Sequence, residues 1–99
     1  MKAHELLADK SKWTTGARGR NAAGASVGAN AIDAVCWCAN GAIEVCYGSN
    51  WREPAKKARE LAEVRHSTLG SSRKGMSLSE VNDRLSYEDV MAILKEADV

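Results

Sequence analysis

The chain has 99 residues, of which 44% are hydrophobic and 27% are charged, and its formal net charge is +1 at pH 7. This composition is typical of one globular domain spanning residues 1–99 and excludes a disordered or fibrous chain. No apolar run approaches the roughly 20 residues of a membrane span, and the charged N-terminus differs from a secretory signal, so we expect no membrane contact and a cytoplasmic location. A nucleic-acid binder would usually be more basic, so we do not expect nucleic acid as a partner.

The first 28 residues predict a short helix followed by a hairpin. Residues 3–9 have helical spacing, with Leu6 and Leu7 on the inner face. Residues 13–28 contain repeated glycines among small side chains, which disfavours a helix. The segment Asn21-Ala22-Ala23-Gly24 matches a type I turn, because Asn favours its first position and Gly its fourth. We therefore expect a β-hairpin over residues 13–28, with Trp13 at its base.

Residues 31–47 predict the central helix of the fold. Wound at 3.6 residues per turn, their apolar side chains cover a broad arc, so other elements must contact this helix on several sides. Asn30 can cap its first turn, and Gly48 stands where a left-handed residue would end it. Four core residues are expected: Val35, Trp37, Ile43 and Leu94.

The second half of the chain predicts further helices. They are a helix over 51–66, a polar loop over 67–76, a short helix over 78–84 and a last helix over 87–97. Asn50, Ser77 and Ser86 are the expected N-caps, each with an acidic residue three positions later. The whole pattern predicts a mainly α domain with a minor β part (α+β), in which three to four helices surround the central apolar helix and one small β-hairpin packs beside them.

Three cysteines lie in the predicted central helix. With His4 or His66 they could suggest a zinc site, but side chains two positions apart on a helix point about 200° apart, and no Cys-x-x-Cys pair is present. A cysteine nucleophile with His66 as its base would need an accessible thiolate. We expect buried structural thiols instead, with no metal and no cofactor. The three are Cys36, Cys38 and Cys46.

The glycine-rich hairpin carries two arginines that are candidate ligand-binding residues. Backbone freed by Gly16 and Gly19 can approach an anion, while the Arg18 and Arg20 guanidinium groups supply planar donor forks. A phosphate-bearing small molecule or nucleotide is one interpretation, and a solvated hairpin is the other. No phosphate-binding fingerprint such as a Walker motif is present.

A second basic surface is predicted on the helix over 51–66 and the loop that follows it. It is either a solvated helix face or a nucleic-acid contact, and we favour the solvated face. The surface comprises Lys56, Lys57, Arg59, Arg65, Arg73 and Lys74.

Four residues are candidates for a protein interface: Trp13, Trp37, Asn40 and Glu44. On the central helix, the large Trp37 ring beside Gly41 leaves a notch that another element or a partner could occupy. The alternative is that both tryptophans are core residues or anchor the hairpin, and we favour this alternative. Asn82 and Asp83 either cap the start of the last helix or tie it to the rest of the fold, or they form a polar site, and we favour the first role.

Three segments together resemble a known family. They are Trp13-Thr-Thr-Gly16-Ala17-Arg18, the stretch Ala34-Val35-Cys36-Trp37-Cys38-Ala39-Asn40-Gly41-Ala42, and Val81-Asn82-Asp83. The chain is similar over about residues 3–97 to small bacterial and bacteriophage proteins that share a domain of unknown function. That resemblance implies a phage or mobile-element setting and no established activity.

The sequence contains no convergent set of acid, base and nucleophile, so we do not expect an enzyme. The favoured hypothesis is a non-catalytic interaction module that binds and modulates a host protein or associates with itself. A different class stays open, in which the protein binds or sequesters a phosphate-containing small molecule or nucleotide through the hairpin. An enzyme is the third alternative.

Overall fold

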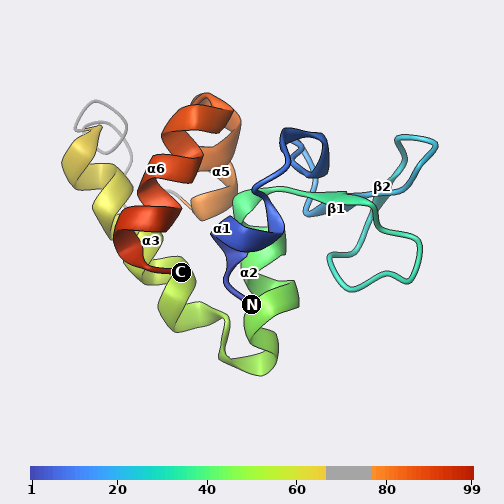
Figure 1. Ribbon diagram of the computed structural model, residues 1–99, viewed down its shortest axis with the longest axis horizontal. Coiled ribbons are helices and arrows are strands. Elements are labelled where there is room, and N and C mark those ends of the chain that lie inside the picture. Colours follow the sequence, from blue (N-terminus) through green and yellow to red (C-terminus); the bar gives the residue numbers. More distant parts are fainter. Residues whose placement is uncertain (67–76) are drawn as a thin grey trace.

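The computed structural model describes residues 1–66 and 77–99. Within them the α-helices are α1 (Ala3–Leu6), α2 (Ala39–Tyr47), α3 (Arg52–Arg65), α5 (Leu78–Arg84) and α6 (Tyr87–Ala97). The strands are β1 (Gly19–Arg20), β2 (Ser26–Val27) and β3 (Cys36–Trp37), and two short 3-10 turns are η1 (Lys10–Lys12) and η2 (Gly48–Asn50). The prediction of a mainly α fold with a minor β part is confirmed (Figure 1).

The core lies between the helices and is built around α2 and α6. Helix α2 packs between α1 and α5, while α3 packs against α5 and α6. Ile43 of α2 and Leu94 of α6 are fully buried, as predicted. Many of the other buried residues are alanines, whose small side chains let the helix backbones approach closely. Those of α2 and α3 are Ala39, Ala42, Ala55, Ala58 and Ala62.

The predicted central helix over 31–47 is wrong in its first half. Helix α2 begins only at Ala39, and Cys38 is its N-cap in place of Asn30. Residues 36 and 37 form β3 instead, with the backbone N–H of Val35 donating to the Arg20 carbonyl over 2.8 Å. Valine, cysteine and tryptophan suit a strand, and pairing with β1 outweighs their helical spacing. Val35 is consequently 48% exposed, so its predicted place in the core is also wrong.

The remaining helices match the prediction more closely. Ser77 and Ser86 are the N-caps of α5 and α6, and each hydroxyl accepts a backbone N–H bond of 3.2 Å. Asn50 does not cap α3, because it belongs to η2 and the helix starts after Trp51. The loop predicted over 67–76 lies outside the described residues.

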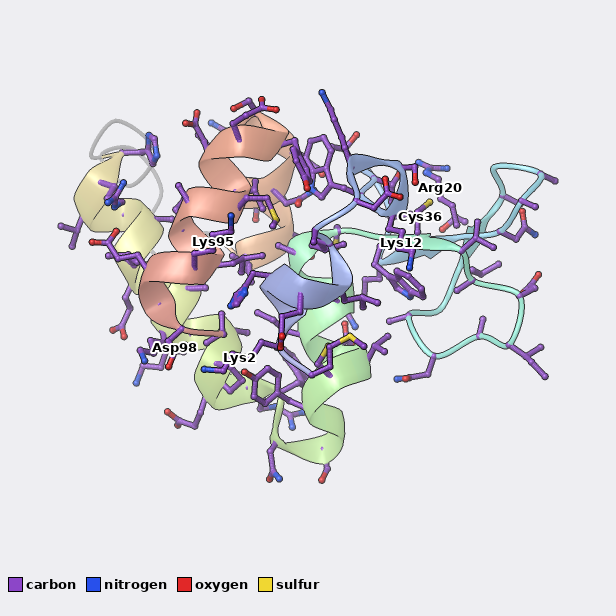
Figure 2. The ribbon with its side chains drawn as sticks, viewed as in Figure 1. Lys2, Lys12, Arg20, Cys36, Lys95 and Asp98 are labelled. Carbon is purple, nitrogen blue, oxygen red and sulfur yellow. The ribbon has the colours of Figure 1, made fainter. Side chains whose placement is uncertain are left out.

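The N-terminal helix is shorter than predicted, and it joins the two ends of the chain. Helix α1 ends at Leu6, and η1 follows after Asp9, whose carboxylate accepts from the Ser11 N–H at 3.0 Å. Lys2 forms an ion pair with Asp98, which Figure 2 shows beside it at the C-terminal end of α6. The termini are therefore held against each other on the helical side of the molecule (Figure 1).

The predicted hairpin is present, but it belongs to a three-stranded sheet in the order β2-β1-β3. Both pairings are antiparallel, and Gly19 of β1 lies between Val27 on one side and Trp37 on the other. The turn follows the prediction, because the Gly24 N–H donates to the Asn21 carbonyl over 2.9 Å and Gly24 has a φ of +84°. Only glycine adopts that backbone conformation at little cost.

Candidate functional site

The sheet and its loops form an arm, defined here as residues 19–37, which extends away from the helices (Figure 1). The molecule measures 36 Å along its longest axis and 23 and 22 Å across the others. The arm exposes apolar side chains, since Ile32 at its loop is fully exposed and Val35 is half exposed. Exposed aliphatic side chains on a projecting element are candidates for a protein contact.

The Arg20 side chain stabilises the hairpin by hydrogen bonds to other residues of the same segment. Its Nε donates to the Thr14 hydroxyl over 3.2 Å, while its two terminal nitrogens donate to the carbonyls of Gly24 and Thr15 over 2.9 and 3.1 Å. Figure 2 shows this side chain beside Cys36 where the arm meets the helical body. Several of the guanidinium donors are therefore used within the chain, and Arg20 holds the hairpin to the segment before it.

Arg18 has different partners from Arg20. Its guanidinium forms an ion pair of 3.3 Å with Glu44 of α2 and lies 6.0 Å from the centre of the Trp51 ring. Glu44 in turn accepts from the Asn40 side-chain amide over 2.8 Å. The two hairpin arginines hence bind separate parts of the molecule and do not form one donor fork.

The notch predicted between Trp37 and Gly41 on the central helix is wrong, because Trp37 lies in β3 and only Gly41 lies in α2. A Cβ atom on Gly41 would lie 2.0 Å from the Arg18 carbonyl oxygen, so the backbone before β1 passes directly over this position of α2. The Trp37 indole N–H donates to the Ala29 carbonyl over 2.8 Å, which ties the arm loop to β3.

The buried Asn82 side chain joins three elements at the root of the arm. Its oxygen accepts from the Trp13 indole N–H at 2.7 Å and from the Ala39 backbone N–H at 3.0 Å, and its amide donates to the Thr14 carbonyl at 3.0 Å. The carboxylate of Asp83 accepts from the Gly16 N–H at 2.9 Å. Asn82 and Asp83 thus have a structural role, as favoured from the sequence, but they tie α5, and not the start of the last helix, to the hairpin and to α2.

The candidate residues singled out from the sequence therefore serve mainly to connect the arm to the helices. Gly16 donates to Asp83 and has a φ of +76°, whereas Gly19 is buried in the sheet, where an added Cβ would lie 3.1 Å from the Gly28 carbonyl. Of the four interface candidates, Asn40 is buried and the rest are partly exposed.

The thiols differ in exposure. Cys38 is buried, and its sulfur accepts from the Gly41 N–H over 3.3 Å, so the side chain serves as the N-cap of α2. Burial raises the pKa of the Cys38 thiol above its ordinary value and keeps it protonated. Cys36 and Cys46 are only half-buried, so the prediction of buried thiols is wrong for these two. Over residues 1–66 and 77–99, no three His, Cys, Asp or Glu side chains are grouped to hold a metal ion.

Ile32 and Val35 were missed as candidate surface residues because their spacing fits the inner face of a helix. A signal was present, since Gly28 and Asp33 interrupt the apolar pattern and Ala34-Val35-Cys36-Trp37 is also a short run suited to a strand. The Asp33 carboxylate accepts from the Asn21 amide over 3.2 Å, which connects the arm loop to the hairpin turn.

Among the helices of residues 1–66 and 77–99, none has both the length and the apolar character that a membrane span requires.

Comparison with known proteins supports the resemblance drawn from the sequence motifs. No curated protein and no solved structure matches the chain. A family model, described as a family of unknown function (DUF6197), matches residues 1–98. Because this match covers nearly the whole chain, the protein belongs to that family.

Proposed function

We propose that the protein is a non-catalytic interaction module that binds a protein partner through its arm. The observation that supports this most is the full exposure of Ile32, together with the half exposure of Val35, on an arm that packs against the core cluster through Trp37. Burying a side chain of this kind contributes about 1.5 to 3 kcal/mol, so a partner that covers both would gain appreciable affinity.

The arm is also held in place for such a contact. Arg20 fixes the hairpin turn, and the Trp37 indole holds the loop before β3. A surface that is already ordered loses less conformational entropy on binding than a flexible one does. The bracing of the arm at its root therefore favours a specific contact.

The backbone of the arm offers a second kind of contact. Strand β2 is one of the two outer strands of the sheet, and among the described residues its outer edge has no strand partner. Such an edge can add one strand of a partner protein by backbone hydrogen bonds. With only two residues, β2 would supply few of them, so the apolar side chains provide most of the affinity.

The proposed partner is a host protein, in keeping with the phage or mobile-element setting that the sequence resemblance implies. Self-association through the same side chains is the second form of the proposal. Either partner would meet a nearly uncharged surface, because the exposed tip carries Asp33 and little other charge.

The test replaces both exposed aliphatic side chains, as Ile32→Ser with Val35→Ser. Val64→Ser is the matched control, because Val64 is 78% exposed but lies on α3, away from the arm. Tagged proteins are incubated with host lysate, and captured proteins are quantified by mass spectrometry. A partner that Val64→Ser retains and the double variant loses by tenfold or more supports the proposal. Equal capture by both variants contradicts it.

Self-association is tested on the same three proteins by light scattering after size-exclusion chromatography. The monomer has a mass of 10.7 kDa. A dimer of the wild type and of Val64→Ser that becomes a monomer in the double variant would identify the arm as the interface between copies. A monomer in all three proteins, without lysate capture, contradicts the interaction proposal in both forms.

A further inference from the structure

A cleft of about 410 Å³ lies between α3 and the start of α5, outside the arm. One wall is the face of α3 that begins at Trp51, and the opposite wall is formed by Ser77, Leu78 and Ser79. Arg18 and Asn40 complete the lining. The cleft thus joins residues from four separate stretches of the chain. Lys56 and Arg59 belong to the basic surface predicted from the sequence, whereas Arg18 and the serines were not grouped with them.

The lining is strongly basic. It contains Arg18, Arg52, Lys56 and Arg59 and no carboxylate among its described residues. Of these four cations, only Arg18 has an ion-pair partner within the described residues, namely Glu44. The three on α3 stand at helical spacing and face the same cleft, although like charges at that spacing repel one another. An anion placed between them would remove this repulsion.

Arg59, which lines the cleft, has a hydrogen-bond donor without a partner among the described residues. Its Nε is buried and has no hydrogen-bond partner in the part of the chain that the structure describes. A buried donor of a charged group is unfavourable without an acceptor. Since the Arg59 side chain lines the cleft, oxygen atoms of a bound anion could bind its guanidinium and offset that cost.

Trp51 orders two of the guanidinium groups. The Arg52 guanidinium carbon lies 4.9 Å from the centre of the Trp51 ring, and that of Arg18 lies 6.0 Å from it. Cation–π contacts of this kind hold the planar groups without neutralising them. The hydroxyl of Ser77 on the facing wall is a further polar group that can donate to an oxygen.

We propose that this cleft binds a small soluble polyphosphate, with two linked phosphate groups as the minimum unit. One phosphate dianion matches two cations, whereas three cationic side chains of α3 line this cleft without an ion-pair partner among the described residues, and Arg18, paired with Glu44, is the fourth. Arginine forks bind phosphate oxygens in pairs, and lysine supplies a compact charge. The unit is either free pyrophosphate or the phosphate end of a nucleotide, and both present the same oxygen atoms to the cleft.

Isothermal titration calorimetry with pyrophosphate tests the proposal, and Lys56→Gln and Lys57→Gln are a matched pair. Both lysines are exposed neighbours on α3, but only Lys56 lines the cleft. We expect Lys56→Gln to weaken pyrophosphate binding at least tenfold and Lys57→Gln to change it less than twofold. Equal loss in the two variants would show general charge attraction and would overturn the proposal, as would the absence of binding to the wild type.

Arg59→Gln is a second variant, and circular dichroism shows whether it folds. If it folds, pyrophosphate binding should again fall at least tenfold; if it does not, the lysine pair still decides the question. All titrations are compared at equal ionic strength, because screening weakens non-specific attraction.

Titrations with three further ligands distinguish free pyrophosphate from a nucleotide as the ligand of the cleft. Orthophosphate should bind at least tenfold more weakly than pyrophosphate, because it reaches fewer of the cations. Equal affinity of pyrophosphate and nucleoside triphosphates indicates that the phosphates make all the contacts, whereas tighter nucleotide binding identifies a nucleotide as the ligand. Tighter binding of a single-stranded oligonucleotide than of any small polyphosphate would overturn the proposal. These results do not depend on the arm, so the two proposals can fail separately.

Discussion

The Trp13 indole N–H donates to the Asn82 side-chain oxygen over 2.7 Å, although 69 positions separate the two residues in the chain. The same oxygen accepts from the first residue of α2, so one amide side chain positions the base of the hairpin and the start of a helix together. Asn82 is fully buried, which makes each of these bonds costly to lose. It is therefore the polar centre of the connection between the arm and the helices.

We expect Asn82→Ala to destabilise the protein by about 2 to 5 kcal/mol, because the substitution leaves the Trp13 indole, the Ala39 N–H and the Thr14 carbonyl without their partner. Urea unfolding followed by circular dichroism measures the change. Asn50→Ala is the control, since Asn50 is exposed, and it should stay within about 0.5 kcal/mol. An Asn82→Ala protein as stable as the control would refute this role.

A pair of glycine substitutions tests the close approach between the arm and α2. An added Cβ on Gly41 would collide with the Arg18 carbonyl, whereas nothing lies within 4 Å of the corresponding position at Gly28. Gly41→Ala should therefore cost about 1 to 3 kcal/mol or more, as overpacking does, and Gly28→Ala should change stability little. Thermal unfolding compares the two. Similar melting temperatures would show that the backbone at Arg18 can move away without cost.

A pair of isoleucine substitutions separates the core from the arm. Ile43 is fully buried on α2, and Ile32 is fully exposed on the arm loop. Ile43→Ala should cost about 2 to 5 kcal/mol through lost burial and the cavity left behind. Ile32→Ala should stay within about 0.5 kcal/mol, because it removes no packing. Unfolding in urea measures both, and a large loss in Ile32→Ala would mean that the arm loop packs against the body in solution.

The Cys38 thiol predicts a loss of stability at alkaline pH. Burial raises its pKa in the folded protein above the ordinary value of 9.0. At a pH between the ordinary pKa and the raised pKa, the unfolded chain has therefore lost a proton that the folded protein keeps. The free energy of unfolding should thus be unaffected well below pH 9.0 and fall as pH rises through it, by up to about 1.4 kcal/mol per pH unit.

Cys38→Ser provides the comparison, because a serine hydroxyl can accept from the Gly41 N–H but does not titrate in this range. Burial also raises the pKa values of Cys46 and Tyr87, and both residues stay in the variant, so the difference between the two proteins isolates Cys38. Urea unfolding from pH 7 to pH 10 under reducing conditions measures it. Parallel pH curves for the two proteins would contradict the proposed effect of burial.

Much of the helical part could be predicted from local sequence signals. Ser77 and Ser86 mark the starts of α5 and α6, because a hydroxyl before a helix bonds the free N–H groups of its first turn. The turn at Asn21-Ala22-Ala23-Gly24 likewise follows from residues that favour its backbone angles. These signals act within a few positions, so no knowledge of the rest of the fold is needed to recognise them.

Tertiary contacts alone decided the start of α2 and the nature of the arm. The stretch over 31–38 has apolar spacing that suits a helix, yet residues 36 and 37 pair with β1 as a strand. That pairing turns Ile32 and Val35 outwards, which makes them surface residues. The basic cleft also depends on tertiary packing, because Arg18 and Arg52 lie 34 positions apart in the chain and both contact the Trp51 ring in the folded protein. Local propensities are weak compared with burial and sheet pairing, and contacts between distant residues leave no periodic trace in the sequence.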